Sequence, residues 1–156
     1  MIDLLKTNIP DFFAAAEVED FEYYLDNELE QYFVYEVEGR LIGAGGINYI
    51  EEGVTGKISW DFIHSDYQGK GIGSQLLAHR LQLLFSDEAI KKVILRTSQF
   101  VFPFYAKFGF EPLKTEHDYW AKGYHLYHME LDRNRYKRRM DYSKLDYLKW
   151  LGVNAI

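Results

Sequence analysis

Three glycines at alternate positions precede an apolar run in the segment DYQGKGIGSQL, which covers residues 66–76. Gly69, Gly71 and Gly73 stand where a helix is expected to begin, although glycine is a poor helix former. Glycine suits places where the backbone takes a left-handed conformation or must approach another group closely. This turn is therefore the feature that most constrains the fold of the chain and what the chain can bind.

Three interpretations compete for this turn. The simplest is a flexible connection without a ligand. A known nucleotide loop is the second, but a Walker loop requires Ser or Thr after Gly-Lys, and a dinucleotide fingerprint requires glycine where the chain has Ser74. The third is a pyrophosphate cradle of another spacing, made of backbone N–H groups and the positive end of the next helix. Lys70 and Ser74 would add a charge and a hydroxyl to such a cradle.

The composition indicates one globular domain in the cytoplasm. The chain has 156 residues, of which 47% are hydrophobic, so it can bury a core. A net charge of −6 argues against general nucleic-acid binding, and we interpret the basic run 133–139 as a solvated face. There is no cysteine, and the five histidines lack metal-ligand spacing. We expect no metal, and no apolar run approaches the roughly 20 residues that a membrane span needs.

Hydrophobic periodicity predicts helices before and after a group of strands. The expected elements are two short helices in 4–31, two strands in 32–50 joined at Gly39, a strand over 57–64, a helix over 71–85, a strand over 92–97, a helix within 100–110 that Gly109 closes, and a strand over 123–132. This order predicts a mixed α/β domain with one sheet covered by helices. A basic link (133–139) and an amphipathic helix at about 141–151 should follow, with an apolar side made of Leu145, Leu148, Trp150 and Leu151.

Two motifs in this order resemble a known family. Residues 68–73 match the Q/R-x-x-G-x-G/A motif, and residues 104–110 read FYAKFGF, which matches an FY-x-K-x-GF signature. Over roughly residues 1–132 the chain resembles the GNAT superfamily of acyl-CoA-dependent N-acyltransferases. The resemblance implies an α/β (α+β) fold with a mixed, mostly antiparallel central sheet, flanked by helices, whose parallel strands four (57–64) and five (92–97) splay apart. The family usually begins with a strand before its first helix, and no such run precedes the first predicted helix here, so we expect either that this strand is lost or that the chain is a shortened form.

The resemblance also implies acetyl-CoA as cosubstrate and assigns residues to it. The pyrophosphate would lie on the backbone of the glycine turn, and the pantetheine arm would bond to the backbone of Ile63. Tyr105 corresponds to the family tyrosine that protonates the departing thiolate, a role that suits a phenol with an ordinary pKa near 10. The cofactor-binding residues implied are Ile63, Gln68, Gly69, Lys70, Gly71, Ile72, Gly73, Ser74, Ser98 and Lys107.

The chain departs from the family pattern at several positions. Ser65 stands where a proline is frequent, and Ser98 replaces an asparagine that holds a pantetheine carbonyl. Pro103 should kink the helix within 100–110 or delay its start. Loss of the first strand would expose a sheet edge.

The acceptor side is less defined by the sequence. An ammonium has no lone pair, so a base must take its proton. Candidates for this base are Asp61, Glu51, Glu52, His64, His117 and Asp118, each of which also has a structural interpretation. Residues 116–131 should cover the acceptor site, with His117, Tyr119 and Trp120 lining it, packing a hairpin or forming a dimer contact. The several carboxylates favour a cationic amine.

These observations predict a cytoplasmic N-acetyltransferase that transfers an acetyl group to a primary amine in a ternary complex, because no cysteine can carry an acyl intermediate. The alternative is an inactive CoA-binding or structural module of the same fold. A third hypothesis, association with nucleic acid through 133–139, requires binding that falls steeply with salt. The acetyltransferase domain should span 1–132. Residues 133–156 should hold the basic link and the C-terminal helix, which we expect to form a homodimer contact.

Overall fold

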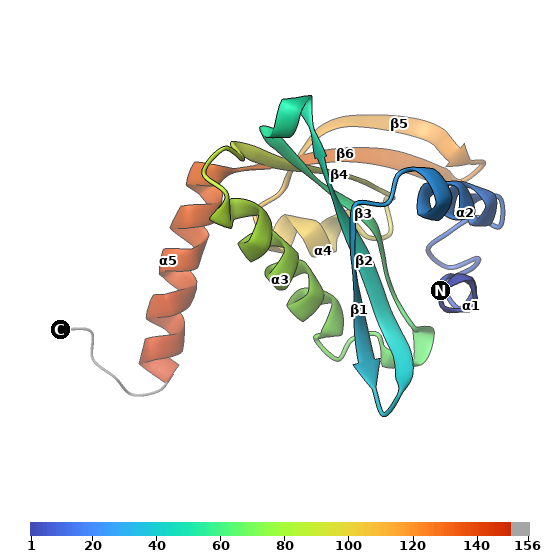
Figure 1. Cartoon of the computed structure of the whole chain (residues 1–156), viewed down its shortest axis with the longest axis horizontal. Helices are drawn as coiled ribbons and strands as arrows, with labels where there is room; N and C mark the ends of the chain where they lie inside the picture. The colour runs from blue at the N-terminus through green and yellow to red at the C-terminus, as the bar shows by residue number, and fades with distance from the viewer. Residues whose placement is uncertain (151–156) are drawn as a thin grey trace.

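Six strands form one sheet in the computed structural model of this chain, with helices on both of its faces (Figure 1). The structure describes the backbone of residues 1–150 and the side chains of residues 1–141. The strands are β1 (Gln31–Val37), β2 (Arg40–Ile50), β3 (Thr55–Ile63), β4 (Lys92–Thr97), β5 (Glu111–Ala121) and β6 (Tyr124–Asp132). The helices are α1 (Ile2–Lys6), α2 (Glu17–Asn27), α3 (Ile72–Ser86), α4 (Phe102–Lys107) and α5 (Arg133–Trp150), with short 3-10 turns η1 (Glu51–Gly53) and η2 (Ser65–Tyr67).

The sheet has the order β1-β2-β3-β4-β6-β5, and its only parallel pair among these strands is β3–β4. This pair is short. Residues Thr55–Ile58 pair with Lys92–Leu95, and beyond Ile58 and Leu95 the two strands no longer pair with each other. The predicted splay between the two parallel strands is therefore confirmed, as is the absence of a strand before β1 in the described part of the chain.

A bulge in β3 decides which side chains face which side of the sheet. The register between β2 and β3 shifts between Ala44 and Gly46, and Trp60 has a φ of 45°. Such a bulge bends the strand and redirects its side chains. Trp60 and Phe62 pack on the side of α1 and α2, whereas Asp61 reaches the side of α3.

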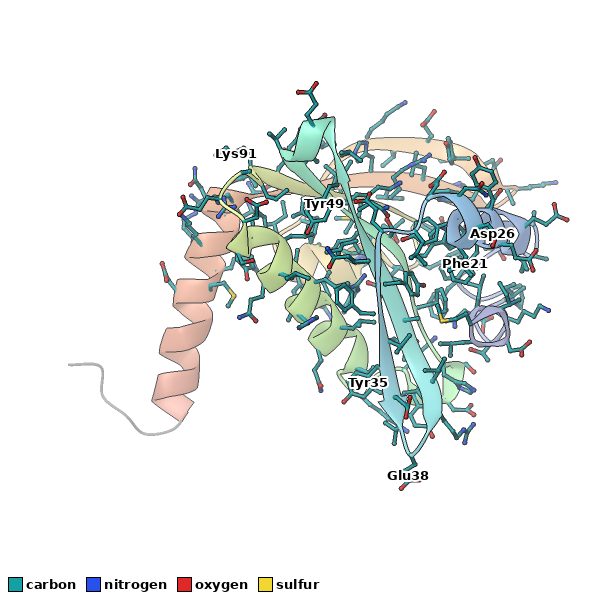
Figure 2. The ribbon with its side chains drawn as sticks, viewed as in Figure 1. Phe21, Asp26, Tyr35, Glu38, Tyr49 and Lys91 are labelled. Carbon is teal, nitrogen blue, oxygen red and sulfur yellow. The ribbon has the colours of Figure 1, made fainter. Side chains whose placement is uncertain are left out.

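Two apolar cores flank the sheet. The larger one holds α3 and α4 against the sheet and includes Leu77, Leu81 and Leu84, which all lie on one stripe of α3. The smaller one holds α1 and α2 against β2 and β3 around Phe21, which is fully buried. Figure 2 shows Phe21 between α2 and the strands. Its ring centroid lies 5.3 Å from that of Phe62 and 5.0 Å from that of Trp60.

Local turn predictions are confirmed. Gly39 has a φ of 76° in the β1–β2 hairpin, whose tip is marked by Glu38 in Figure 2. Gly109 has a φ of 96° and directly follows Phe108, the C-cap of α4. The helix α4 starts at Phe102, directly before Pro103. Pro103 is therefore in the first turn, where its missing N–H costs no hydrogen bond within the helix.

Two expectations about elements were wrong. The strand β5 was not predicted, because its side chains are mostly exposed and polar, and antiparallel pairing with β6 defines it instead. Residues 133–139 are not a link but the beginning of α5. Tyr136 stacks on Phe85 at 4.4 Å, and Arg133 donates to Phe85 O, so tertiary contacts hold this turn in a helix. The apolar side predicted from Leu145, Leu148, Trp150 and Leu151 lies outside the described side chains. Within the described residues, no helix is long and apolar enough to cross a membrane.

Candidate active site

The glycine turn gives two of its three glycines a conformation that other residues rarely adopt. Gly69 and Gly71 have φ values of 73° and 81°, and Gly71 is the N-cap of α3. A Cβ on either would meet no atom within 4 Å, so backbone conformation rather than crowding explains these two glycines. Gly73 lies in the first turn of α3, where a Cβ would make only ordinary contacts at 3.6 Å with Ile63 and Phe104.

A cleft of about 870 Å³ begins at this turn, passes between the splayed strands β3 and β4, and reaches α2 on the other side. Its size is in the range of small-molecule and cofactor sites. Of the residues assigned from the sequence, the cleft is lined by Ile63, Gln68, Gly69, Gly71, Ile72, Gly73, Ser74, Ser98 and Tyr105. The tertiary structure therefore brings nearly all of them to one cavity.

Lys70 and Lys107 are the two assigned residues that do not line the cleft. The Lys70 ammonium lies 4.8 Å from the centroid of the Tyr67 ring. Lys107 is in the last turn of α4, and its carbonyl accepts a hydrogen bond from Arg139. The charge that Lys70 was expected to add to the cradle is directed to an aromatic ring in this structure.

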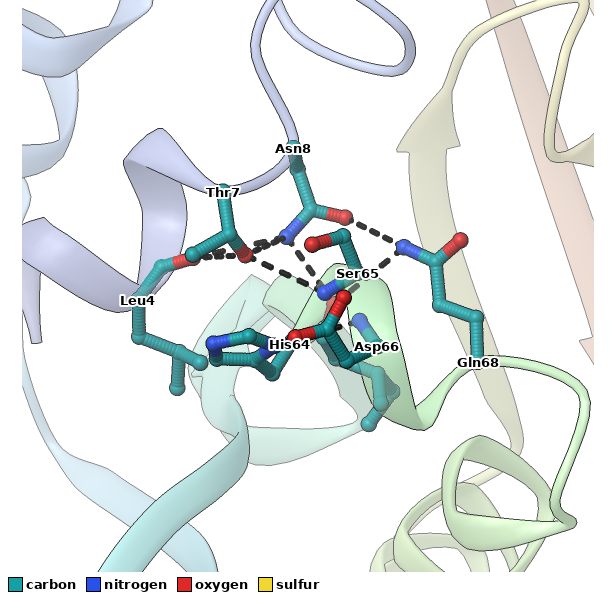
Figure 3. A network of polar contacts seen from close by, with 8 residues as sticks. Leu4, Thr7, Asn8, His64, Ser65, Asp66 and Gln68 are labelled. Atoms are coloured by element: carbon teal, nitrogen blue, oxygen red, sulfur yellow. Dashed lines mark hydrogen bonds and ion pairs between the residues drawn. The ribbon is translucent and has the colours of Figure 1, made fainter.

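A network of amides connects the N-terminal segment to the glycine turn (Figure 3). Asn8 Nδ2 donates to Ile63 O at 2.9 Å, and Gln68 Nε2 donates to Asn8 Oδ1 at 2.7 Å and to Ile63 O at 3.2 Å. The Ser65 N–H donates to Thr7 Oγ1 in the same network. The side chain of Gln68 therefore anchors the start of the turn, and its backbone is the part available to a ligand.

The same network determines what Ile63 can offer. The His64 N–H donates to Ile42 O at 2.8 Å, so the backbone groups of the preceding residue, Ile63, point away from β2 and toward the splay. Both amide side chains already bond to the Ile63 carbonyl. The N–H of Ile63 is thus the group suited to a pantetheine carbonyl.

Tyr105 belongs to a buried polar cluster. Its hydroxyl donates to Asp61 Oδ2 at 3.1 Å, and the same oxygen accepts from Arg80 Nη2 at 2.6 Å. Arg80 is fully buried and also donates to Leu76 O and Gly46 O. The strand leaves room for this guanidinium at Gly45, where a Cβ would lie 2.4 Å from Arg80 Nη1.

The cluster keeps Tyr105 protonated. Burial raises the pKa of Tyr105 well above its ordinary value, and the negative charge of Asp61 adds to this effect, while Arg80 opposes it. An ionised carboxylate accepts hydrogen bonds and cannot donate them, which makes Tyr105 the donor toward Asp61. The phenol is thus a neutral hydrogen-bond donor in the wall of the cleft.

Of the six bases considered from the sequence, only Asp61 lines the cleft, and it is already held in an ion pair with Arg80. Glu51 and Glu52 lie in η1, beyond the far end of β2. His64 caps η2 by accepting from the Asp66 N–H. The other two, His117 and Asp118, lie on β5 outside the cleft lining, and His125 contacts both of them.

Three carboxylates that sequence reasoning missed line the cleft from α2 and its C-cap. Glu17, Asp20 and the C-cap residue Glu28 recur with Tyr24 at intervals of three or four residues, so they lie along one side of the helix. Glu17 is 7% exposed, and burial raises the pKa of its carboxyl to about 7, with the Asp20 charge contributing and the Ala14 N–H opposing. The spacing was visible in the sequence, but nothing local indicated which face of α2 meets the cleft.

Of the three residues considered for the acceptor site, Tyr119 and Trp120 line the cleft from β5, whereas His117 does not. The guanidinium of Arg96 on β4 lies 4.7 and 5.0 Å from the centroids of these two rings. The strand pair β5–β6 therefore contributes an aromatic wall to the end of the cleft that faces α2.

The described residues fit the cofactor that the motif implied. Two left-handed glycines precede α3, and the first N–H groups of a helix lack partners within the helix, so the turn offers donors to an anion. The splay leaves backbone groups of β3 unpaired with β4, in reach of an extended arm. Tyr105 completes the wall between these two features.

Comparison with protein families agrees with this geometry. A family model described as an acetyltransferase (GNAT) domain matches residues 3–133. No curated protein matches the sequence.

Solved structures share the fold. A putative acetyltransferase of the GNAT family from Desulfovibrio desulfuricans superposes with a TM-score of 0.67 at 15% identity, over 84% of this chain and 89% of that chain. An aminoglycoside 6'-N-acetyltransferase complexed with coenzyme A gives 0.67 at 14% identity, over 84% and 87%. A spermidine/spermine N-acetyltransferase from Vibrio cholerae gives 0.62 at 17% identity, over 80% and 77%.

Proposed function

This chain belongs to the GNAT acetyltransferase family, and we propose that it transfers the acetyl group of acetyl-CoA to a primary amine by direct attack in a ternary complex. The observation that carries the proposal is the single cleft that joins the glycine turn, the splay and Tyr105. The aminoglycoside acetyltransferase of the same fold binds coenzyme A, which supports the choice of cofactor. When bound, acetyl-CoA would supply an activated thioester carbonyl.

The glycine turn and α3 would hold the pyrophosphate. Residues 69–74 offer backbone N–H groups, and the Ser74 hydroxyl is close by in the same wall. A hydrogen bond to a charged group contributes roughly 1.5–3 kcal/mol, so a few such bonds suffice for a specific site. The side chain of Gln68 would hold the start of the turn in place through Asn8.

Tyr105 would act on the leaving group. A thiolate that departs is stabilised by a hydrogen bond or a proton, and Tyr105 is a neutral phenol because its pKa is raised by burial. Its single hydroxyl proton, which is donated to Asp61 Oδ2 in this structure, would turn to the thiolate. Asp61 and Arg80 would hold its ring and hydroxyl in position. Since the chain has no cysteine, the amine would attack directly rather than through a thioester on the protein.

Tyr105→Phe tests the proposal. We expect acetyl-CoA to bind wild type and variant with similar affinity in a calorimetric titration, with micromolar binding corresponding to about −8 kcal/mol. Turnover of the variant should fall by about 100-fold or more, as is usual for loss of a general acid. Tyr49→Phe is a matched control, because Tyr49 packs against the same core but does not line the cleft.

Each result has a clear meaning. Equal turnover in Tyr105→Phe would remove Tyr105 from the mechanism. Absence of acetyl-CoA binding to the wild type would overturn the proposed function. Binding without turnover of any amine in a broad panel would favour the inactive CoA-binding module. We also propose a cytoplasmic location and a homodimer contact through the chain after Asp132, and an unchanged oligomeric state on truncation there would refute the dimer.

A further inference from the structure

Glu17 is a buried carboxylate in the wall of the cleft with one oxygen available. It is the first residue of α2, and its Oε2 accepts a hydrogen bond from the Ala14 N–H at 2.7 Å. Among the described side chains, none donates to its other oxygen, Oε1, or forms an ion pair with it. Oε1 is therefore without a partner and is not fully buried. Because Glu17 lines the cleft, this oxygen is open to it.

The surroundings of Glu17 supply no compensating positive charge. The other ionisable residues of the cleft wall are Asp20, Tyr23 and Tyr24 on α2, its C-cap Glu28, Lys57 and Asp61 on β3, Arg96 on β4, and Tyr67, Tyr105, Tyr119 and Tyr124 elsewhere. Neither Lys57 nor Arg96 forms an ion pair with Glu17, and the charge that acts on the pKa of Glu17 is that of Asp20, which is negative. A carboxylate taken out of water normally has a cationic partner, and no side chain among residues 1–141 forms an ion pair with this one.

Aromatic rings line the same cleft as this carboxylate. Phe13 and Trp60 both line the cleft and stack on each other at a ring-centroid distance of 6.2 Å with an interplanar angle of 14°. Phe12 and Tyr23 extend the same wall. Faces of aromatic rings attract cations and also accommodate apolar groups. A carboxylate and such rings in the wall of one cleft suit an ammonium group on an apolar body.

We propose that Glu17, assisted by Asp20, binds the ammonium group of the acceptor, so that the acceptor is a primary amine that enters the cleft as a cation, with its apolar part against Phe13 and Trp60. This inference rests on the proposed function for the identity of the cleft as the acceptor site. Zwitterionic amines would be disfavoured, because a carboxylate next to their amine would approach Glu17 and Asp20. Amines that are uncharged at neutral pH would gain nothing from this pair.

The competing explanation is that Glu17 only caps the turn through Ala14. Glu17→Gln separates the two roles, because the amide oxygen can still accept from the Ala14 N–H while the charge is lost. Asp20→Asn removes the assisting charge. Glu19→Gln is the matched control, because Glu19 is an exposed residue of the same helix turn and does not line the cleft.

The test is calorimetric titration of the protein alone, without acetyl-CoA, with butylamine, 1,4-diaminobutane and 2-phenylethylamine, each beside its alcohol counterpart. We expect at least one amine to bind at least tenfold more tightly than its alcohol. This preference should disappear in Glu17→Gln, weaken severalfold in Asp20→Asn and stay unchanged in Glu19→Gln.

Proton release provides a second measurement that a structural cap would not affect. At pH 7 a carboxyl with a pKa of about 7 is protonated in roughly half of the molecules. A cation beside Glu17 stabilises its ionised form, so binding of the amine should release roughly half a proton per protein molecule. Titrations at pH 7 in two buffers of different ionisation enthalpy measure this number. Wild type should release the proton on binding the amine, and Glu17→Gln should release none.

Three results would overturn the inference. They are equal affinities of the amines and alcohols for wild type, amine binding that Glu17→Gln leaves unchanged, and amine binding without proton release. A separate titration with acetyl-CoA distinguishes this from failure of the proposed function. If acetyl-CoA does not bind but the preference for amines over alcohols depends on Glu17, the ammonium site at Glu17 is supported and the proposed acetyl transfer is refuted.

Discussion

The buried pair Arg80–Asp61 should be the most sensitive polar interaction in this fold. The guanidinium is fully buried, the Asp61 side chain is 9% exposed, and their atoms are 2.6 Å apart. Removal of one partner from such a pair leaves an uncompensated buried charge and costs about 3–5 kcal/mol. We therefore expect Arg80→Met and Asp61→Asn each to lower the free energy of unfolding by about this amount. For a chain of this size the melting temperature should fall by on the order of 10 °C.

The double variant isolates the interaction. With both charges gone, its loss of stability should be smaller than the sum of the two single losses, by about 1–3 kcal/mol. Urea denaturation monitored by circular dichroism measures all four free energies. Arg135→Met is the control, because Arg135 pairs with a largely exposed Glu111 and surface pairs of this kind contribute at most about 1 kcal/mol.

Small effects would refute this reasoning. If Arg80→Met lost less than about 1 kcal/mol, the pair would be no more important than a surface ion pair, contrary to its burial. If the two single losses simply added, Arg80 and Asp61 would not interact in solution as the structure shows. The position of Tyr105 would then have to be explained without Asp61.

Three further outcomes follow from the site. The pKa of Glu17 is higher in the folded chain than in the unfolded chain, so wild type should lose stability relative to Glu17→Gln as the pH rises from about 4.5 to 7, by at most about 3 kcal/mol. If the difference in free energy of unfolding between wild type and Glu17→Gln is the same at pH 5 and pH 8, this expectation is wrong. Gly73→Ala should raise stability by up to about 1 kcal/mol in a thermal scan while weakening acetyl-CoA binding, and unchanged affinity would remove Gly73 from the cradle. Gly45→Ala should instead lower the free energy of unfolding by about 1–3 kcal/mol, because its Cβ would meet the Arg80 guanidinium. If urea denaturation shows no loss of stability, the guanidinium can move aside.

Several features of this protein could be predicted because they depend on residues close together in the chain. The left-handed turns at Gly39 and Gly109 need only the local φ that glycine permits. The stripe of leucines on α3 and the strand at 92–97 follow from side-chain periodicity. The two motifs around the glycine turn and Tyr105 predicted the fold, and most of their residues do line one cleft.

The sequence could not show the polar partners inside that cleft. Tyr105 and Asp61 are 44 residues apart, Arg80 lies 19 residues from Asp61, and Gln68 meets Asn8 across 60 residues. The bulge at Trp60 and the strand β5 depend on the register of neighbouring strands. The face of α2 that turns Glu17 to the cleft depends on how Phe21 packs against β3. Local φ preferences and periodicity fix the elements of this chain, but burial and charge pairing act between elements, so only the tertiary structure decides which side chains form its site.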